Sequence, residues 1–104
     1  MKVTIIGRWG AYPAKGEATS CYLIEVEHYK FVLDLGSGSL SQLSKLIDLS
    51  EIDAVFISHV HADHLADLMT LQYAALVDSQ LGRRKKKLDI YLNDSEEYIQ
   101  FEHP

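Results

Sequence analysis

Four metal-binding side chains within six residues constrain this chain more than any other feature: His59, His61, Asp63 and His64. They follow residues 53–58, a short apolar run with β-branched residues that is typical of a buried strand. Side chains two apart in an extended strand leave on the same face, so His59 and His61 can converge on one cation. Asp63 and His64 lie where a helix should begin, and the change of direction there turns them toward a second, nearby point. The sequence therefore predicts two adjacent metal sites.

The donor types indicate which metal such sites would hold. Imidazole nitrogen and carboxylate oxygen suit zinc, and also manganese or iron, whereas magnesium and calcium normally draw more oxygen ligands. The competing interpretation is that these histidines are solvated loop residues, or a chance cluster beside an active site of another kind. The spacing and the context favour metal binding, because residues 65–80 contain no Gly or Pro and predict a long helix directly after the loop.

The remaining pattern predicts an α/β fold with one mixed sheet and helices on one of its faces. Strands are expected over residues 2–6, 20–27, 30–35, 53–58 and 88–92, and helices over 39–49 and 65–80. The second and third strands are separated by a tight connection at His28 and Tyr29, so they should pair antiparallel.

At the four predicted ligands the chain resembles the metallo-β-lactamase fold superfamily, whose signature His-x-His-x-Asp-His is intact here. The segment Asp34-Leu35-Gly36-Ser37-Gly38 closes a strand as that superfamily's earlier Asp-x-Gly motif does. The opening Val3-Thr4-Ile5-Ile6-Gly7, with Pro13 and Ser20-Cys21-Tyr22-Leu23 after it, is similar to the ribonuclease Z-like and related phosphodiesterase branch.

The resemblance implies a metal-dependent hydrolase with two zinc ions, or manganese or iron, bridged by water. His59 and His61 would hold the first ion, and Asp63 and His64 the second. Asp63 is the implied catalytic residue, which orients or deprotonates the attacking water. Asp34 is expected to accept a hydrogen bond from a ligand imidazole and so fix its tautomer. The alternative is that Asp34 only caps the turn at residues 36–38.

The length of 104 residues allows at most one domain and is about half of what the resembled fold needs. Two catalytic zinc sites need about six protein ligands, and the motif contains four. We therefore expect residues 1–104 to form the N-terminal half of an αββα metallo-β-lactamase sandwich, inactive alone and completed by a C-terminal half. Residues 94–100 begin like a capped helix. The sheet face meant for the other half would be exposed, so the chain should self-associate into a homo-oligomer.

The preferred function is hydrolysis of a phosphodiester, in a small molecule or a nucleic acid. The alternatives are hydrolysis of another ester, a thioester, a lactone or a β-lactam, or an inactive fragment that acts only as an interaction module. A diiron oxidoreductase is disfavoured, because such members of the resembled superfamily carry Glu where His61 stands.

Charge and cysteine content bound the partners and the compartment. The net charge of −5 does not indicate a nucleic-acid-binding protein as a whole, because such proteins usually carry a large basic surface. Residues 83–87, however, hold five of the ten Lys and Arg residues. This run is either a solvated turn or a phosphate-facing loop. Cys21 is the single cysteine, which excludes an internal disulfide, and no apolar run is long enough for a membrane span. We expect a cytoplasmic protein with no membrane partner.

Overall fold

The computed structural model describes residues 1–92, which form five strands and three α-helices with one short 3-10 helix. The strands are β1 (Lys2–Gly7), β2 (Cys21–Val26), β3 (Tyr29–Leu33), β4 (Ala54–Ile57) and β5 (Asp89–Leu92). The helices are α1 (Ser39–Leu43), the 3-10 helix η1 (Leu49–Glu51), α2 (Ala62–Leu65) and α3 (Leu68–Gln80).

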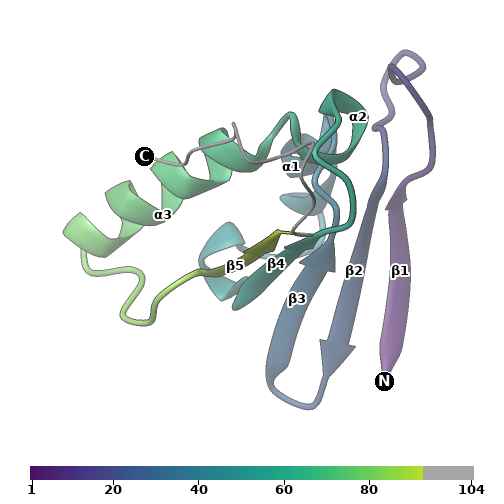
Figure 1. Cartoon of the computed structure of the whole chain (residues 1–104). Helices are drawn as coiled ribbons and strands as arrows, with labels where there is room; N and C mark the ends of the chain where they lie inside the picture. The colour runs from purple at the N-terminus through teal and green to yellow at the C-terminus, as the bar shows by residue number, and fades with distance from the viewer. Residues whose placement is uncertain (93–104) are drawn as a thin grey trace.

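All five strands form one mixed sheet in the order β1-β2-β3-β4-β5 (Figure 1). The pairs β1–β2 and β2–β3 are antiparallel, as predicted for β2 and β3, whereas β3–β4 and β4–β5 pair in parallel. A parallel pair needs a crossover, and these crossovers carry the helices, which lie on one side of the sheet. The predicted α/β architecture is confirmed.

The core lies between the sheet and the helices. One alternating set of strand residues faces it, including Leu23, Val32 and Val55, and the helices contribute buried residues such as Leu43 and Leu71. Side chains on a strand alternate between the two faces, so the other set points away from the helices.

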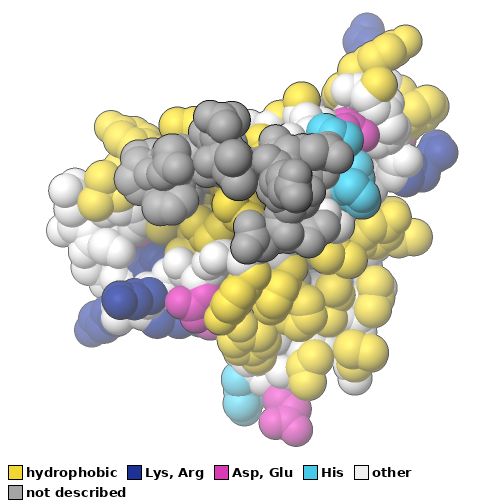
Figure 2. Space-filling model, in the orientation of Figure 1, with side chains coloured by type: hydrophobic (Ala, Val, Ile, Leu, Met, Phe, Trp, Pro, Cys, Tyr) yellow, Lys and Arg dark blue, Asp and Glu magenta, His cyan; other side chains and the backbone are white. Residues whose placement is uncertain are grey.

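The opposite face of the sheet is apolar and has no layer on it within residues 1–92; we call it the open face. Four aromatic rings cross it as a row, in which Phe31 lies 5.7 Å from Tyr29 and 5.2 Å from Phe56, and Phe56 stacks on Tyr91 at 4.6 Å. Ile5 extends the face on the edge strand β1 and is 65% exposed. Figure 2 shows hydrophobic side chains spread over the strands at the lower part of the molecule.

The prediction of one helix over residues 39–49 is wrong, because α1 ends at Leu43. Asp48 is the N-cap of the next helix, η1, so the chain starts a new helix there instead of continuing α1. The Asp48 side chain accepts the Ser50 N–H, and the Glu51 carboxylate accepts the Asp48 N–H, so this capping box starts η1 instead.

The helix predicted over residues 65–80 is confirmed from Leu68 to Gln80 (α3), but its predicted start is wrong, because Leu65 ends the separate helix α2. At the break, the Asp67 N–H donates to the Leu35 carbonyl, and the Asp67 carboxylate accepts the Leu40 N–H. These two contacts draw the chain toward the loop after β3 and the start of α1, and they accompany the break between α2 and α3.

The helix start predicted at residues 94–100 lies outside the described residues. Among the helices of residues 1–92, none has the length and the apolar composition that crossing a lipid bilayer requires.

Candidate metal centre

The predicted ligands lie at the carboxyl end of β4, where the chain leaves the sheet and enters α2. This edge of a parallel strand pair is the usual place for ligand sites in open α/β sheets. His59 and His61 are exposed, while Asp63 and His64 are half-buried. The loop between β1 and β2 approaches from one side, because the Ala11 N–H donates to Asp63 Oδ2 at 3.3 Å. Figure 2 shows histidine side chains gathered beside an acidic one at this end of the molecule.

The imidazoles are neighbours. The His59 ring centroid lies 6.0 Å from that of His61, with the planes 20° apart, and 5.0 Å from that of His64. His64 Nε2 lies 3.5 Å from Asp63 Oδ2. Within residues 1–92, however, no three or more His, Cys, Asp or Glu side chains are grouped so that they could hold a metal ion. The imidazole and carboxylate groups are of the types that bind zinc. They lie close to one another, but within the described residues they do not surround a common point.

Asp34 is the buried centre of a hydrogen-bond network behind these ligands. Its carboxylate accepts the Ser58 N–H at 2.7 Å and the Ser20 hydroxyl at 3.3 Å, and it lies 2.8 Å from His64 Nδ1. The backbone of Asp34 is left-handed, with φ of 64°, a conformation that Asp tolerates better than most residues. Asp34 thus lies against one predicted ligand imidazole; that this imidazole binds a metal remains a prediction.

The loop after β3 also contacts the metal-binding loop through its backbone. The Leu35 N–H donates to the His64 carbonyl at 2.6 Å. At Gly36 the two segments approach so closely that a Cβ atom would lie 1.9 Å from Thr19 Oγ1 and 2.4 Å from the Asp63 carbonyl oxygen. Only glycine fits there without movement of its neighbours, which explains the glycine of the Asp-x-Gly segment.

Two members of the network, Ser20 and Ser58, are not indicated by any ligand pattern in the sequence. Ser58 could have been identified by its position directly before His59 at the end of a strand. Ser20 has no such signal, because it reaches Asp34 only once β2 and β3 are paired.

Residues 14–87 match the family described as the metallo-beta-lactamase superfamily. This chain belongs to that superfamily. The Bacillus subtilis protein named "Probable metallo-hydrolase YhfI" is 45% identical over 96 residues, which cover 92% of this chain and 39% of that protein. The crystal structure of YhfI superposes with a TM-score of 0.88 at 43% identity, over 94% of this chain and 40% of that one. The chain therefore spans about 40% of the length of this relative.

Ribonuclease Z proteins are further relatives of this superfamily member. That of Methanopyrus kandleri is 34% identical over 82 residues, covering 78% of this chain and 29% of the relative. Human "Zinc phosphodiesterase ELAC protein 1" is 30% identical over 92 residues, covering 88% of this chain and 25% of that protein. The human tRNase Z short form (ELAC1) has the same fold, with a TM-score of 0.65 at 22% identity over 88% of this chain and 43% of that one. The resemblance to the superfamily and its ribonuclease Z-like branch is confirmed.

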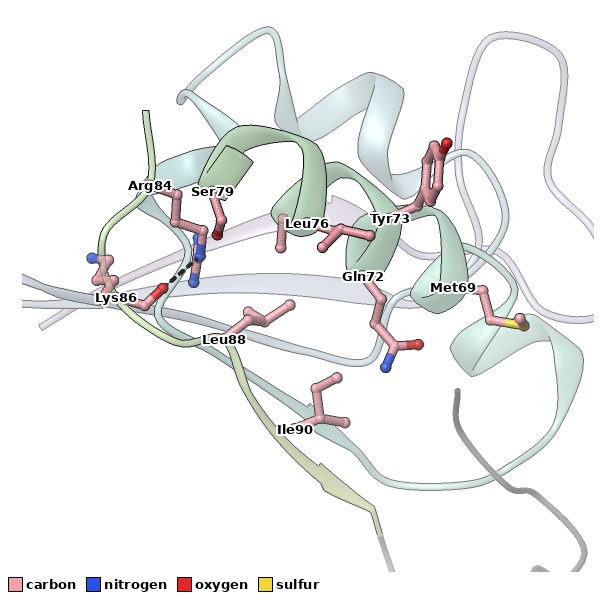
Figure 3. A pocket seen from close by; sticks show the side chains of 10 residues that line it. Met69, Gln72, Tyr73, Leu76, Ser79, Arg84, Lys86, Leu88 and Ile90 are labelled. Carbon is pink, nitrogen blue, oxygen red and sulfur yellow. Dashed lines mark hydrogen bonds between the residues drawn. The ribbon is translucent and has the colours of Figure 1, made fainter. Parts of the chain in front are cut away.

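In the basic run at residues 83–87, some of the charged side chains bind to other parts of the fold and the others are exposed. Arg84 is only 4% exposed and donates to the carbonyl oxygens of Ser50, Ile52 and Lys86 at 2.9, 2.6 and 3.0 Å. Figure 3 shows the Arg84 guanidinium directed at the Lys86 carbonyl. Arg84 also lines a groove between α3 and β5, which has a volume of about 550 Å³. Burial lowers the pKa of Arg84 against the opposing effect of nearby carboxylates, Asp53 first among them.

Lys86 is held as well, because its ammonium group pairs with the Asp53 carboxylate. Arg84 and Lys86 therefore contribute to holding the fold together. The phosphate-facing alternative applies at most to the exposed Arg83, Lys85 and Lys87. Neither the solvated turn nor the phosphate loop describes the whole run.

Cys21 is fully buried, as its alternating strand predicts. Burial raises the pKa of Cys21 to about 12, while a hydrogen bond with Ser39 acts in the opposite direction. The thiol is thus neutral at ordinary pH and is no candidate nucleophile, because the thiolate is the reactive form.

Proposed function

We propose that this chain supplies part of the metal centre of a hydrolase that cleaves phosphodiesters with metal-activated water. The observation that carries the proposal is the set of three imidazoles and one carboxylate around one strand-to-helix turn, with Asp34 held against His64 Nδ1 at 2.8 Å. Membership of the metallo-β-lactamase superfamily supports it. Zinc is the proposed metal, and manganese or iron would fit the same donors.

His59 and His61 would hold one ion, and Asp63 and His64 the other. A bound divalent cation lowers the pKa of water toward about 7 and stabilises charge on the attacking and leaving oxygens. Asp63 Oδ2 is fixed by the Ala11 N–H at 3.3 Å, and it is the atom that would orient the attacking water and take its proton. Asp34 keeps the His64 ring in place by contact with its Nδ1, which leaves Nε2 directed toward the Asp63 side.

The donor count requires more polypeptide than the described residues supply. Four donors are present where two zinc sites want about six. The YhfI relative is longer, since this chain covers 39% of it. We therefore propose that residues 1–104 act as the N-terminal half of one domain, and that a C-terminal half provides the remaining ligands.

A phosphodiester is the proposed substrate because relatives of this chain carry the names ribonuclease Z and zinc phosphodiesterase. The metal-binding motif activates water without selecting the substrate, so other esters, thioesters, lactones and β-lactams are the alternative substrates. A non-catalytic interaction module is the alternative from outside enzyme chemistry.

The test is to express the whole reading frame that encodes this sequence, measure its metal content, and assay bis(p-nitrophenyl) phosphate with added zinc or manganese. We expect about two ions per protein and turnover that is lost in His59→Ala and His61→Ala variants. A chromogenic β-lactam and a lactone are assayed in parallel. A fully metallated protein that does not turn over the phosphodiester removes the phosphodiesterase assignment, and turnover of the lactam or the lactone would then identify the substrate class. Residues 1–104 alone should bind metal weakly and be inactive.

A further inference from the structure

The hydroxyl group of Ser58 lies between Asp34 and His59. Its Oγ is 3.0 Å from Asp34 Oδ1, 2.7 Å from Asp34 Oδ2 and 3.0 Å from His59 Nδ1. Ser58 is therefore connected to a different imidazole from the one that Asp34 touches directly, which is His64. One carboxylate reaches two predicted ligands, one directly and one through a serine.

Proton counting decides the direction of each hydrogen bond. A serine hydroxyl has one hydrogen and two lone pairs, and an ionised carboxylate can only accept. At 2.7 Å the Ser58 oxygen and the Asp34 oxygen would repel each other unless the hydroxyl hydrogen lies between them. The Ser58 oxygen then faces His59 Nδ1 with a lone pair, so His59 Nδ1 must carry the hydrogen.

The same reasoning applies to the direct contact. Asp34 already accepts from the N–H of Ser58 and the hydroxyl of Ser20, which is the pattern of a carboxylate that accepts every bond. His64 Nδ1 is therefore the donor in the 2.8 Å contact. Both imidazoles therefore carry a hydrogen on Nδ1, and in the neutral form of each ring the lone pair lies on Nε2.

We infer that Ser58 is a positioning residue that transmits the orientation of Asp34 to His59, so that His59 and His64 both present Nε2 to the metal centre. The role of Ser58 in metal binding rests on the proposed function. The tautomers of His59 and His64 follow from the hydrogen bonds alone and do not depend on that function. The two histidines belong to different ions of the proposed centre, and the Asp34–Ser58 pair holds both in the form that can bind. Outer hydrogen-bond partners of this kind typically change metal affinity by about 10- to 100-fold.

The first test reads the tautomers in the metal-free 104-residue chain, by long-range ¹H–¹⁵N correlation of labelled imidazoles at a pH where they are neutral. The wild-type chain should show the Nδ1–H form for His59 and His64. A wild-type His59 in the Nε2–H form would overturn the inference without any variant, and it would leave the hydrolase proposal untouched.

The second test uses variants in the same measurement. Ser58→Ala should release His59 from the Nδ1–H form while His64 keeps it, because His64 contacts Asp34 directly. Ser58→Thr retains a hydroxyl and should restore the wild-type form of His59. Ser20→Ala is the matched control, since Ser20 also donates to Asp34, at 3.3 Å, without being the link to His59. An unchanged His59 tautomer in Ser58→Ala would overturn the inference.

The third test measures zinc affinity by competition with a chromogenic chelator, on the product of the whole reading frame. Ser58→Ala should weaken zinc binding by about 10-fold or more, and Ser58→Thr should recover most of the loss. Equal affinity in all three proteins would show that Ser58 does not position a ligand. Loss of phosphodiesterase activity plays no part in this readout, so failure of the inference and failure of the proposed function are separable.

Discussion

Asp34 Oδ2 lies 2.8 Å from His64 Nδ1, although 30 residues separate the two in sequence. Asp34 directly follows β3, and His64 lies in α2 beyond β4, so the contact exists only because these two strands pair in parallel. The contact links the Asp-x-Gly segment to the metal-binding motif, and it places a buried carboxylate directly behind one predicted ligand.

Asp34→Asn should destabilise the chain and weaken metal binding. Asn keeps the shape and tolerates the left-handed backbone, but its amide group cannot accept from every donor around it. We expect a loss of about 1–3 kcal/mol in the free energy of unfolding, measured by urea denaturation. The exposed Asp89 offers a matched control, and Asp89→Asn should leave stability near wild type. Equal stability of the two variants would contradict the role of Asp34 as the centre of the network.

Gly36→Ala should be strongly destabilising, because its Cβ would lie 1.9 Å from Thr19 Oγ1 and 2.4 Å from the Asp63 carbonyl oxygen. We expect a cost of about 2 kcal/mol or more from forced movement of backbone. Gly10→Ala provides the comparison, since nothing lies within 4 Å of a Cβ at that position. Thermal unfolding of both variants checks the prediction, and a Gly36→Ala melting temperature as high as that of Gly10→Ala would exclude the close approach.

Arg84→Met should lower stability, whereas Arg83→Met should not. The Arg84 guanidinium donates to buried carbonyls of the segment before β4, and these acceptors would lose their partner in the variant. A loss of about 2–4 kcal/mol is expected from unsatisfied buried groups. Arg83 is exposed and pairs only loosely with Asp78, at 3.5 Å. Chemical denaturation of the two variants side by side is the measurement, and an Arg84→Met variant as stable as Arg83→Met would contradict the structural role of Arg84.

Asp53 should make the fold sensitive to acid. Burial, the largest single influence, raises the pKa of Asp53, but the hydrogen bond from the Lys30 N–H and the pairing with Lys86 outweigh it and hold the pKa below its ordinary value of 3.8. A carboxyl whose pKa is lowered in the folded state contributes stability above its unfolded pKa and loses it as the pH falls through the folded value. Wild type should therefore lose more stability than Asp53→Asn between about pH 5 and pH 2.5. Parallel urea titrations across that range test this, and identical slopes would count against it.

The open face should drive self-association of the 104-residue chain. Contiguous exposed apolar surface of this kind favours association, because association removes it from water. A second copy of this chain has the same face and can cover it. Sedimentation velocity should show a mass that rises with protein concentration. Ile5→Lys, at a position 65% exposed on this face, should shift the equilibrium toward monomer, while Leu81→Lys, 59% exposed after α3, should not. A monomer at every concentration would contradict the prediction.

Local patterns predicted the strands well and the helices poorly. The alternating apolar residues of β2 and the apolar run of β4 have the period that a half-buried or buried strand requires, so both were recognisable. The helix predicted over 65–80 breaks at Asp67, because Asp67 bonds to Leu35 and Leu40 on a different segment. The periodicity of residues 65–80 carries no sign of these contacts, since their partners lie in the loop after β3 and in α1.

The set of candidate metal donors follows from the amino-acid sequence alone, because the spacing of His59, His61, Asp63 and His64 along one strand-to-helix turn is a local property. The groups that lie behind these donors depend on the tertiary structure. Asp34 meets Ser20 across 14 residues and Ser58 across 24, and hydrogen bonds over such distances form only when β2, β3 and β4 lie side by side in the sheet. The physical reason is that strand pairing and core packing are non-local, so they set the partners of each side chain after the local pattern has fixed the donors.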